Sequence, residues 1–222
     1  MLPTNINNVL FDLDGTLADT APDLAYALNQ LLQEQGEPAL PLETIRPTVS
    51  QGGIVMISQF LHIDQEDEAF PALRQRFLDI YSSNLANETA LFPGMRQVLD
   101  RLEADNISWG IVTNKVSWLT DPLMRALGLE QRAGCIVSGD TVEHSKPHPA
   151  PMLHACQLID RAPSRTLYVG DAKRDIEAGH NAGMYTLIAN YGYIAADEDP
   201  STWGADGMIE TPLEILDCLT RQ

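Results

Sequence analysis

The sequence predicts an α/β protein with a doubly wound, mostly parallel sheet and an inserted all-helical domain. Short apolar runs alternate with segments of helical spacing from residue 92 to the end of the chain. Another apolar run, at residues 9–11, stands alone near the N-terminus and ends at acidic residues. Residues 20–88, between these regions, show helical spacing and no clear strand. Alternating strands and helices form parallel sheets with helices on both faces, and the helical stretch then forms a separate unit.

The inserted unit is expected to consist of helices. Apolar residues recur at intervals of three and four over residues 23–33, and Gly36 and Pro38 end this helix. The same spacing predicts helices over about 53–61 and 66–85. The predicted domains are a core of residues 1–17 and 89–222 and a helical domain of residues 18–88.

The core is expected to alternate regularly after its first strand. Val98, Leu99 and Leu102 share one face of a predicted helix, which is the pattern of a helix packed on a sheet. The expected strands cover residues 109–113, 135–137, 166–169, 184–189 and 208–209. The expected helices cover residues 95–104, 119–127, 151–159, 175–182 and 213–219.

The charge of the chain excludes several classes of partner. Asp and Glu number 31 against 14 Lys and Arg, which gives a formal net charge of -17. Such a surface repels nucleic-acid phosphates and anionic membranes, so neither is expected as a partner. An anionic small substrate then requires a metal ion or a few placed cations to overcome the global field.

The cysteines and the N-terminal segment indicate a cytoplasmic protein. Cys135, Cys156 and Cys218 are far apart and match no zinc spacing, so we expect reduced thiols. Residues 1–5 contain neither a basic stretch nor a long apolar run, which predicts no secretion signal. No segment approaches the roughly 18 apolar residues of a membrane span. We expect a monomer or a small homo-oligomer.

Polar residues follow the predicted strands directly. Because the carboxyl ends of parallel strands meet at one edge of a sheet, these side chains are expected to lie close together. They are Asp12 and Asp14 after the first strand, Thr113 and Asn114 after the second, Ser138 to Asp140 with Lys146 further on after the third, and Asp171 with Asp175 after the fourth.

These residue types suit phosphoryl transfer. Clustered carboxylates repel one another and need a divalent cation, and oxygen ligands favour a hard ion such as magnesium. Thr113 and Asn114 can donate hydrogen bonds to an anion, and Lys146 adds positive charge. A carboxylate can also act as the nucleophile. Singly, a Thr-Asn pair is usually a turn or a cap and a lysine is usually exposed, so the combination is what favours a catalytic site.

The helical domain contains a second candidate, at Ser50, Gly52 and Gly53. Paired glycines before a helix can expose backbone amides to an anion. The same residues can equally form a plain turn. Contact with the substrate and a structural turn therefore both remain open.

Four short motifs stand in the chain in this order: Asp12-Leu13-Asp14-Gly15-Thr16, Thr113-Asn114, Lys146-Pro147 and the run from Gly170 to Asp175. Together they resemble the haloacid dehalogenase-like phosphatase superfamily, and the resemblance covers nearly the whole chain. It implies a Rossmann-like core, a helical cap that closes over the site, and a Mg²⁺ cofactor.

The resemblance also implies roles for individual residues. Asp12 would be the nucleophile, and Asp14 the general acid and then the base that activates water. The implied metal ligands are Asp12, Asp14 through its backbone carbonyl, Asp171 and Asp175. The implied phosphate contacts are Thr113 and Lys146, with Thr16 and Asn114 as further candidates.

The substrate is expected to be a small phosphorylated metabolite. Residues 112–115 and 146–149 and the length of the cap resemble phosphoglycolate phosphatases, the first expectation. Residues 49–53 and 203–206 resemble N-acetylmuramic acid 6-phosphate phosphatases, the alternative. The cap's cations are Arg46, Arg74 and Arg76, so at most these meet a substrate carboxylate, and Arg46 is the one predicted to do so. A non-catalytic binding protein on the same fold is the alternative from another class.

Overall fold

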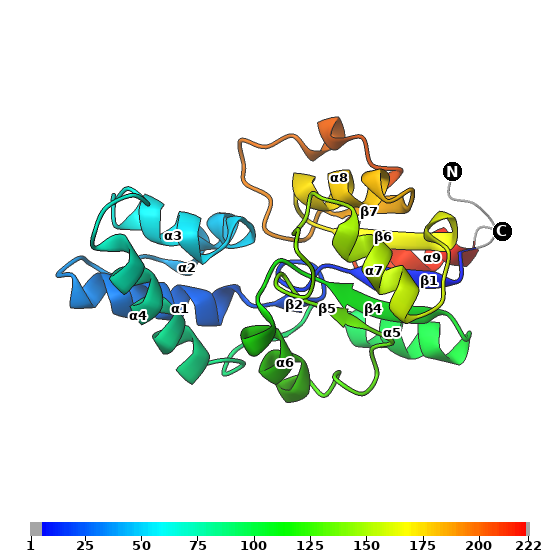
Figure 1. The fold of residues 1–222 in the computed structure, drawn as a ribbon, viewed down its shortest axis with the longest axis horizontal. Coiled ribbons are helices and arrows are strands. Elements are labelled where there is room, and N and C mark those ends of the chain that lie inside the picture. The colour runs from blue at the N-terminus through cyan, green and yellow to red at the C-terminus, as the bar shows by residue number, and fades with distance from the viewer. Residues whose placement is uncertain (1–5, 221–222) are drawn as a thin grey trace.

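The chain folds around a six-stranded parallel sheet, which confirms the α/β class (Figure 1). The computed structural model describes residues 6–220. Residues 1–5 and 221–222 of the predicted core lie outside this part, and with them the N-terminal segment for which no secretion signal is predicted. The strand order is β5-β4-β1-β6-β7-β8, and each neighbouring pair is parallel. The strands are β1 (Asn8–Phe11), β4 (Ser108–Val112), β5 (Ile136–Val137), β6 (Thr166–Gly170), β7 (Tyr185–Ala189) and β8 (Gly207–Ile209).

Both faces of the sheet are covered, as a doubly wound fold requires. Val9 and Phe11 of β1 belong to the apolar cluster that includes α5, α6 and α9, whereas Leu10 belongs to the cluster that includes α7 and α8. This alternation follows from the two-residue period of a strand. The helices are α5 (Met95–Ala104), α6 (Ser117–Ala126), α7 (Ala150–Leu158), α8 (Lys173–Asn181) and α9 (Glu214–Thr220).

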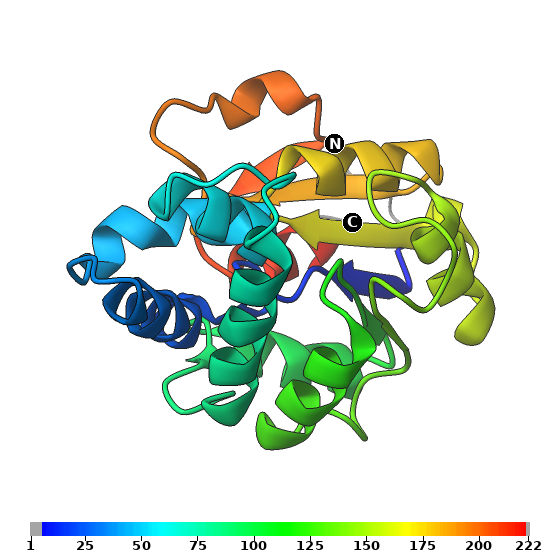
Figure 2. The same ribbon diagram turned by 60° about the vertical axis from the view of Figure 1, so that its left-hand side comes forward.

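The inserted residues form a helical group beyond the carboxyl ends of the strands (Figure 2). Its elements are α1 (Ala21–Glu34), α2 (Leu42–Ile45), the 3₁₀ helix η1 (Arg46–Gln51), α3 (Gly53–Phe60) and α4 (Phe70–Ser83). The helices predicted over 23–33 and 53–61 are confirmed, while α2 and η1 were missed because their short segments have no measurable period. Helix α4 starts later than predicted because Asp64 and Asp67 accept backbone hydrogen bonds from Glu66 and Ala69 and form turns.

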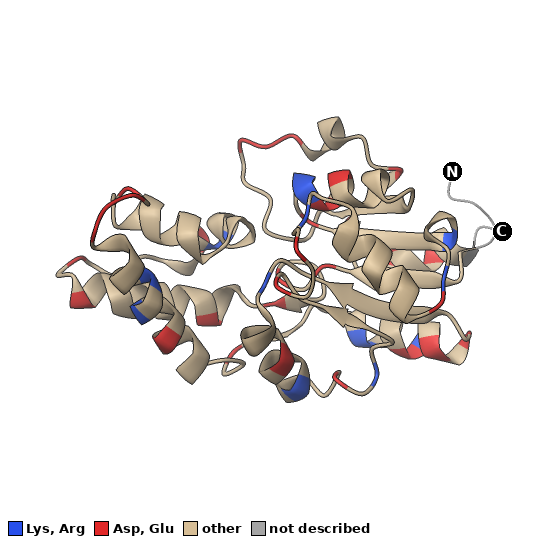
Figure 3. Ribbon diagram, in the orientation of Figure 1, with Lys and Arg blue, Asp and Glu red and all other residues tan. Residues whose placement is uncertain are grey.

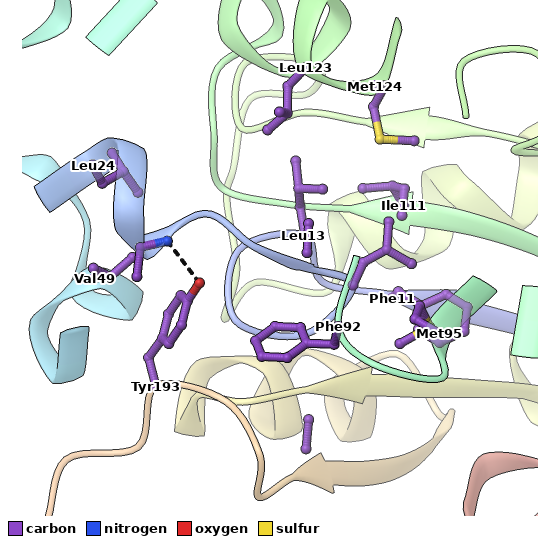
Figure 4. Close-up of a cluster of buried hydrophobic side chains, with 14 of the residues drawn as sticks. Phe11, Leu13, Leu24, Val49, Phe92, Met95, Ile111, Leu123, Met124 and Tyr193 are labelled. Atoms are coloured by element: carbon purple, nitrogen blue, oxygen red, sulfur yellow. Dashed lines mark hydrogen bonds between the residues drawn. The ribbon is translucent and has the colours of Figure 1, made fainter. Parts of the chain in front are cut away.

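The apolar core continues from the sheet into this helical group. Figure 4 shows Leu24 and Val49 beside Tyr193, which follows the sheet strand β7. The Tyr193 hydroxyl accepts a hydrogen bond of 3.0 Å from the backbone N–H of Ala21, at the start of α1. None of the helices within residues 6–220 is long and apolar enough to cross a membrane.

A two-stranded antiparallel sheet lies where the chain enters and leaves the helical group. It joins β2 (Ala18–Asp19) to β3 (Ala90–Leu91), and two residues a strand are too few for a sequence signal. Next to it, the buried Asp23 carboxylate accepts hydrogen bonds from the backbone N–H groups of Glu88 and Thr89 and from the Thr89 hydroxyl. This carboxylate therefore fastens the returning chain to α1.

We predict that Asp23→Ala lowers the free energy of unfolding by about 2–3 kcal/mol, because buried backbone donors lose their acceptor. Urea unfolding followed by circular dichroism measures the change. Glu37→Ala, at an exposed position after α1, serves as the control and should change stability by less than about 0.5 kcal/mol. Equal effects of the two substitutions would contradict the fastening role.

Candidate active site

Three carboxylates converge at the carboxyl edge of the sheet. Asp12 directly follows β1, Asp171 directly follows β6, and Asp175 lies in the first turn of α8. Their nearest carboxylate oxygens lie within 4.8 Å of one another, and all three residues are buried. The structure thus brings together three of the residues that the sequence proposed as metal ligands.

Glycines make this crowding possible. Gly15 has φ +84°, and a Cβ atom there would lie 2.2 Å from Asp171 Oδ2. A Cβ atom on Gly170 would lie 2.4 Å from the Asp175 Cβ. Only glycine lets the loop after β1 and the end of β6 approach these carboxylates so closely.

Hydroxyl groups and a backbone amide orient Asp171. Thr16 Oγ1 donates to Asp171 Oδ1 over 3.1 Å, and Ser50 Oγ donates to Oδ2 over 2.6 Å. The backbone N–H of Tyr193 also donates to Oδ2, over 2.9 Å. Thr16 is fully buried, so in this structure its hydroxyl positions Asp171. The substrate contacts expected of Thr16 and Ser50 stay predictions.

Lys146 sits inside the cluster. Its Nζ lies 2.9 Å from Asp12 Oδ1 and 2.7 Å from Asp175 Oδ1, as ion pairs. Its directional hydrogen bonds go to the Val112 carbonyl, over 2.9 Å, and to the Tyr168 hydroxyl, over 2.8 Å. The lysine therefore supplies the positive charge that partly offsets the clustered carboxylates.

Asn114 has a different role from the expected one in this structure. Its side-chain amide donates to the Lys146 carbonyl and accepts from the Lys146 N–H, each over 3.0 Å. Both ends of the amide therefore hold the backbone of Lys146 in place. A role for Asn114 in contacting phosphate stays a prediction.

The electrostatics of the cluster favour a bound cation. Burial raises the pKa of Asp12 from 3.8 to about 7; the Asp175 carboxylate adds to the rise, and Lys146 opposes it. Burial and Asp175 likewise raise the pKa of Asp171 to about 6. Apart from its ion pair with Lys146, Asp175 Oδ1 has no hydrogen-bond partner within the described residues. Three buried carboxylates facing one ammonium group, with oxygen donors only, fit a hard divalent ion such as Mg²⁺.

Asp14 points to a different partner. Its Oδ1 accepts a hydrogen bond of 2.6 Å from Thr20 Oγ1 and lies 2.8 Å from Lys115 Nζ. Burial lowers the pKa of Lys115, but the Asp14 carboxylate and the Tyr81 hydroxyl together more than offset this, and the net pKa lies above the ordinary value. Lys115 also lies 4.8 Å from the centre of the Tyr81 ring. Sequence reasoning assigned no role to Lys115, although its place directly after Thr113-Asn114 was a usable signal.

A cavity of about 330 Å³ opens beside the cluster. Asp12, Asp14 and Thr113 line it from the sheet side. The residues that line it from the helical group include Ser50, Gly52, Gly53, Arg74, Phe77 and Tyr81. A smaller cavity of about 130 Å³ lies next to it and is lined by Ser50, Asp171 and Arg174 among others.

Arg46, the cation expected to meet a substrate carboxylate, has another partner in this structure, and its contact with substrate stays a prediction. Arg46 forms a two-pronged ion pair with Asp19, over 2.9 and 3.0 Å, and stacks on the Tyr193 ring, so it does not line the cavity. Arg74 lines it instead. Arg174, which sequence reasoning passed over, also lines the cavity and donates to the Ser50 carbonyl.

Local backbone and packing constraints also explain Gly52 and Gly53 of the helical group. Gly52 has φ +88°, a conformation that favours glycine, and its N–H donates to the Val49 carbonyl. A Cβ atom on Gly53 would lie 2.8 Å from the Phe77 ring, so Gly53 lets α3 approach α4. The predicted contact of Gly52 and Gly53 with an anion stays a prediction.

Acidic and basic residues are distributed over the whole fold, and the acidic ones are more numerous (Figure 3). A doubly wound parallel sheet with carboxylates and a buried lysine at its carboxyl edge defines a hydrolase-type site for anionic substrates. Residues 9–189 match the family model described as haloacid dehalogenase-like hydrolase. The chain therefore belongs to the haloacid dehalogenase-like hydrolase family, which confirms the resemblance in the sequence.

Curated relatives carry phosphatase names. The chain is 42% identical over 207 residues to the N-acetylmuramic acid 6-phosphate phosphatase of Pseudomonas putida, with 93% of each chain covered. It is 42% identical over 208 residues to a phosphoglycolate phosphatase of Xanthomonas campestris, again with 93% of each covered. A crystal structure from Haemophilus somnus, described as a predicted phosphoglycolate phosphatase, superposes with a TM-score of 0.85 at 27% identity, covering 96% and 97% of the two chains.

The raised pKa values predict how magnesium stabilises the protein. Because Asp12 and Asp171 bind protons more tightly when folded, the metal-free protein loses stability as pH rises from about 4 to about 7. Magnesium competes with those protons, so its effect grows with pH. We expect a fixed magnesium concentration to raise the melting temperature clearly at about pH 8 and little at about pH 5.

Differential scanning fluorimetry with and without magnesium measures this effect. In Asp171→Asn the magnesium-induced rise should shrink, because the site loses one charged ligand. A rise that is equal at both pH values, or that survives unchanged in Asp171→Asn, would contradict a cation site at this cluster.

Proposed function

We propose that the chain is a magnesium-dependent phosphomonoesterase that forms an aspartyl-phosphate on Asp12. One observation supports this assignment above the others. Of the three clustered carboxylates, Asp12 is the one that also lines the larger cavity, while Asp171 lines the smaller one. Asp12 can therefore contact both a bound cation and a substrate in the cavity.

The metal would be held by the carboxylates of Asp12, Asp171 and Asp175 and by the backbone carbonyl of Asp14. A magnesium ion there supplies the positive charge that lets an anionic phosphate approach clustered carboxylates. Asp175 also caps α8, since its Oδ2 accepts the N–H of Ala172 over 3.0 Å. The helix thereby fixes the direction of this carboxylate.

The two chemical steps use Asp12 and Asp14. An Asp12 oxygen attacks phosphorus, the bond from phosphorus to the alcohol oxygen breaks, and the Asp14 carboxyl donates a proton to the leaving oxygen. Asp14 then takes a proton from water, the water oxygen attacks phosphorus, and the bond to Asp12 breaks. In this structure, Thr20 and Lys115 hold the Asp14 carboxyl at the cavity wall.

Other residues hold the phosphoryl group and close the site. Thr113 lines the cavity and Lys146 contacts Asp12, so these two are proposed to bind the transferring oxygens. Residues 1–17 and 89–222 would form the catalytic core, and residues 18–88 the cap. Closure of such a cap excludes water during the first step. We also propose that the protein is located in the cytoplasm.

Two substrates are proposed because relatives at 42% identity are named for each: phosphoglycolate, and N-acetylmuramic acid 6-phosphate as the alternative. Both are small phosphate esters that carry a carboxylate. Steady-state rates on a panel of phosphorylated metabolites with magnesium, including both compounds, rank them. A wild-type protein inactive on the whole panel would favour a non-catalytic binding protein.

We predict that Asp12→Asn lowers the hydrolysis of p-nitrophenyl phosphate by more than about 1000-fold, because the amide is not a nucleophile. Its fold should remain, since the substitution removes a charge from a crowded cluster. Rates and circular dichroism spectra check the two statements. As a control, Asp79→Asn on the exposed side of α4 should keep wild-type activity. Full activity in Asp12→Asn would refute the nucleophile.

A further inference from the structure

One face of α4 forms a long wall of the larger cavity. Arg74, Phe77, Leu78 and Tyr81 all line it, and they stand three, four and seven positions apart, which places them on one side of a helix. The wall starts at Tyr81, whose ring lies 4.8 Å from Lys115 Nζ, the partner of Asp14. It therefore leads away from the proposed site of proton transfer.

Arg74 lies at the far end of this wall. It is seven residues from Tyr81 within α4, so at 1.5 Å a residue the two are roughly 10 Å apart along the helix axis. Helical side chains lean toward the N-terminus of their helix, which carries the Arg74 guanidinium further from Asp14. A ligand that meets both ends must be about this long.

Arg74 also differs from the other arginines of the helical group in having no carboxylate partner within residues 6–220. Within residues 6–220, the two other arginines of the helical group have carboxylate partners: Arg46 pairs with Asp19, and Arg76 pairs with Glu34 over 2.6 Å. No ion pair or side-chain hydrogen bond of Arg74 occurs in the same described part of the chain. In a protein of net charge -17, an unpaired guanidinium beside a cavity is a ready site for an anion.

The surface between the two ends is apolar. Phe77 is buried in the wall, and Ile54 of α3 faces the same cavity with 39% of its surface exposed. Leu24, Val116 and Leu119 line the cavity as well. Apolar atoms of a ligand placed here would be removed from water, which is favourable.

We propose that the α4 wall selects phosphate esters whose alcohol part carries a carboxylate far enough from the ester oxygen to span the roughly 10 Å from Tyr81 to Arg74, with apolar groups between them. Arg74 binds the carboxylate, and Ile54 and Phe77 contact the apolar part. This inference rests on the proposed phosphatase function and names its substrate class. The carboxylate of phosphoglycolate is one methylene from the ester oxygen, too near to reach Arg74. N-acetylmuramic acid 6-phosphate, with a lactyl carboxylate and two methyl groups across the sugar ring, fits the wall.

A matched pair of substrates tests this proposal. N-acetylglucosamine 6-phosphate differs from N-acetylmuramic acid 6-phosphate only by lacking the lactyl group. We expect the wild type to prefer the carboxylated sugar over both N-acetylglucosamine 6-phosphate and 2-phosphoglycolate in kcat/KM. Arg74→Gln should lower kcat/KM for the carboxylated sugar at least about tenfold, mainly through KM, and change the other sugar by less than about twofold.

Arg76→Gln is the control, because Arg76 is on the same helix, exposed and paired with Glu34. It should leave all three rates unchanged, and Arg74→Lys should retain part of the preference. Equal losses on both sugars in Arg74→Gln, or a wild type that prefers 2-phosphoglycolate, would overturn the proposal.

Binding separates this proposal from the phosphatase function. Calorimetry of the two sugar phosphates with Asp12→Asn protein requires no turnover. Tighter binding of the carboxylated sugar, lost in Asp12→Asn with Arg74→Gln, supports the wall even if Asp12 proves not to be the nucleophile. Equal binding of the two sugars would contradict the proposed selectivity of the α4 wall and would leave the proposed phosphatase function unaffected.

Discussion

The crowding of three buried carboxylates around one lysine is the constraint on which the rest of this structure depends. Asp12, Asp171 and Asp175 reach within 4.8 Å of one another, with Lys146 between two of them. Burial and mutual repulsion raise the pKa values of Asp12 and Asp171, so the charged carboxylates repel one another, and the proposed divalent cation would reduce this repulsion. The packing of the fold at this edge of the sheet and the proposed cation site therefore depend on the same three side chains.

The same cluster ties the helical group to the sheet. Ser50 of the helical group donates to Asp171, and Tyr193 donates to the same carboxylate through its backbone. The Tyr193 hydroxyl in turn donates to Asp19 over 2.7 Å, and Asp19 holds Arg46. The position of the helical group and the geometry of the acidic cluster are therefore linked through a continuous set of hydrogen bonds.

Much of this architecture was accessible from the sequence. The strands after residue 92 and the long helices were predictable, because each buries a periodic apolar face. The short elements α2, η1, β2 and β3 were not, since two to six residues carry no period. Helix α4 began late because aspartate turns replaced its predicted first turn, a competition between side chain and backbone that periodicity does not reveal.

The sequence by itself determined that Asp12, Asp171 and Asp175 would meet, because the ends of parallel strands share one edge whatever the details of packing. Only the tertiary structure decided which lysine or arginine side chain pairs with which carboxylate. Lys115 and Asp14 pair although they are 101 positions apart in the chain. Arg46 pairs with Asp19, whereas the sequence predicted that Arg46 would contact the substrate. Local pattern places a side chain on a face of its own helix or strand. The partner of that side chain depends on how distant segments pack. In this structure the packing pairs Arg46 and Arg76 with carboxylates and places Arg74 at the cavity.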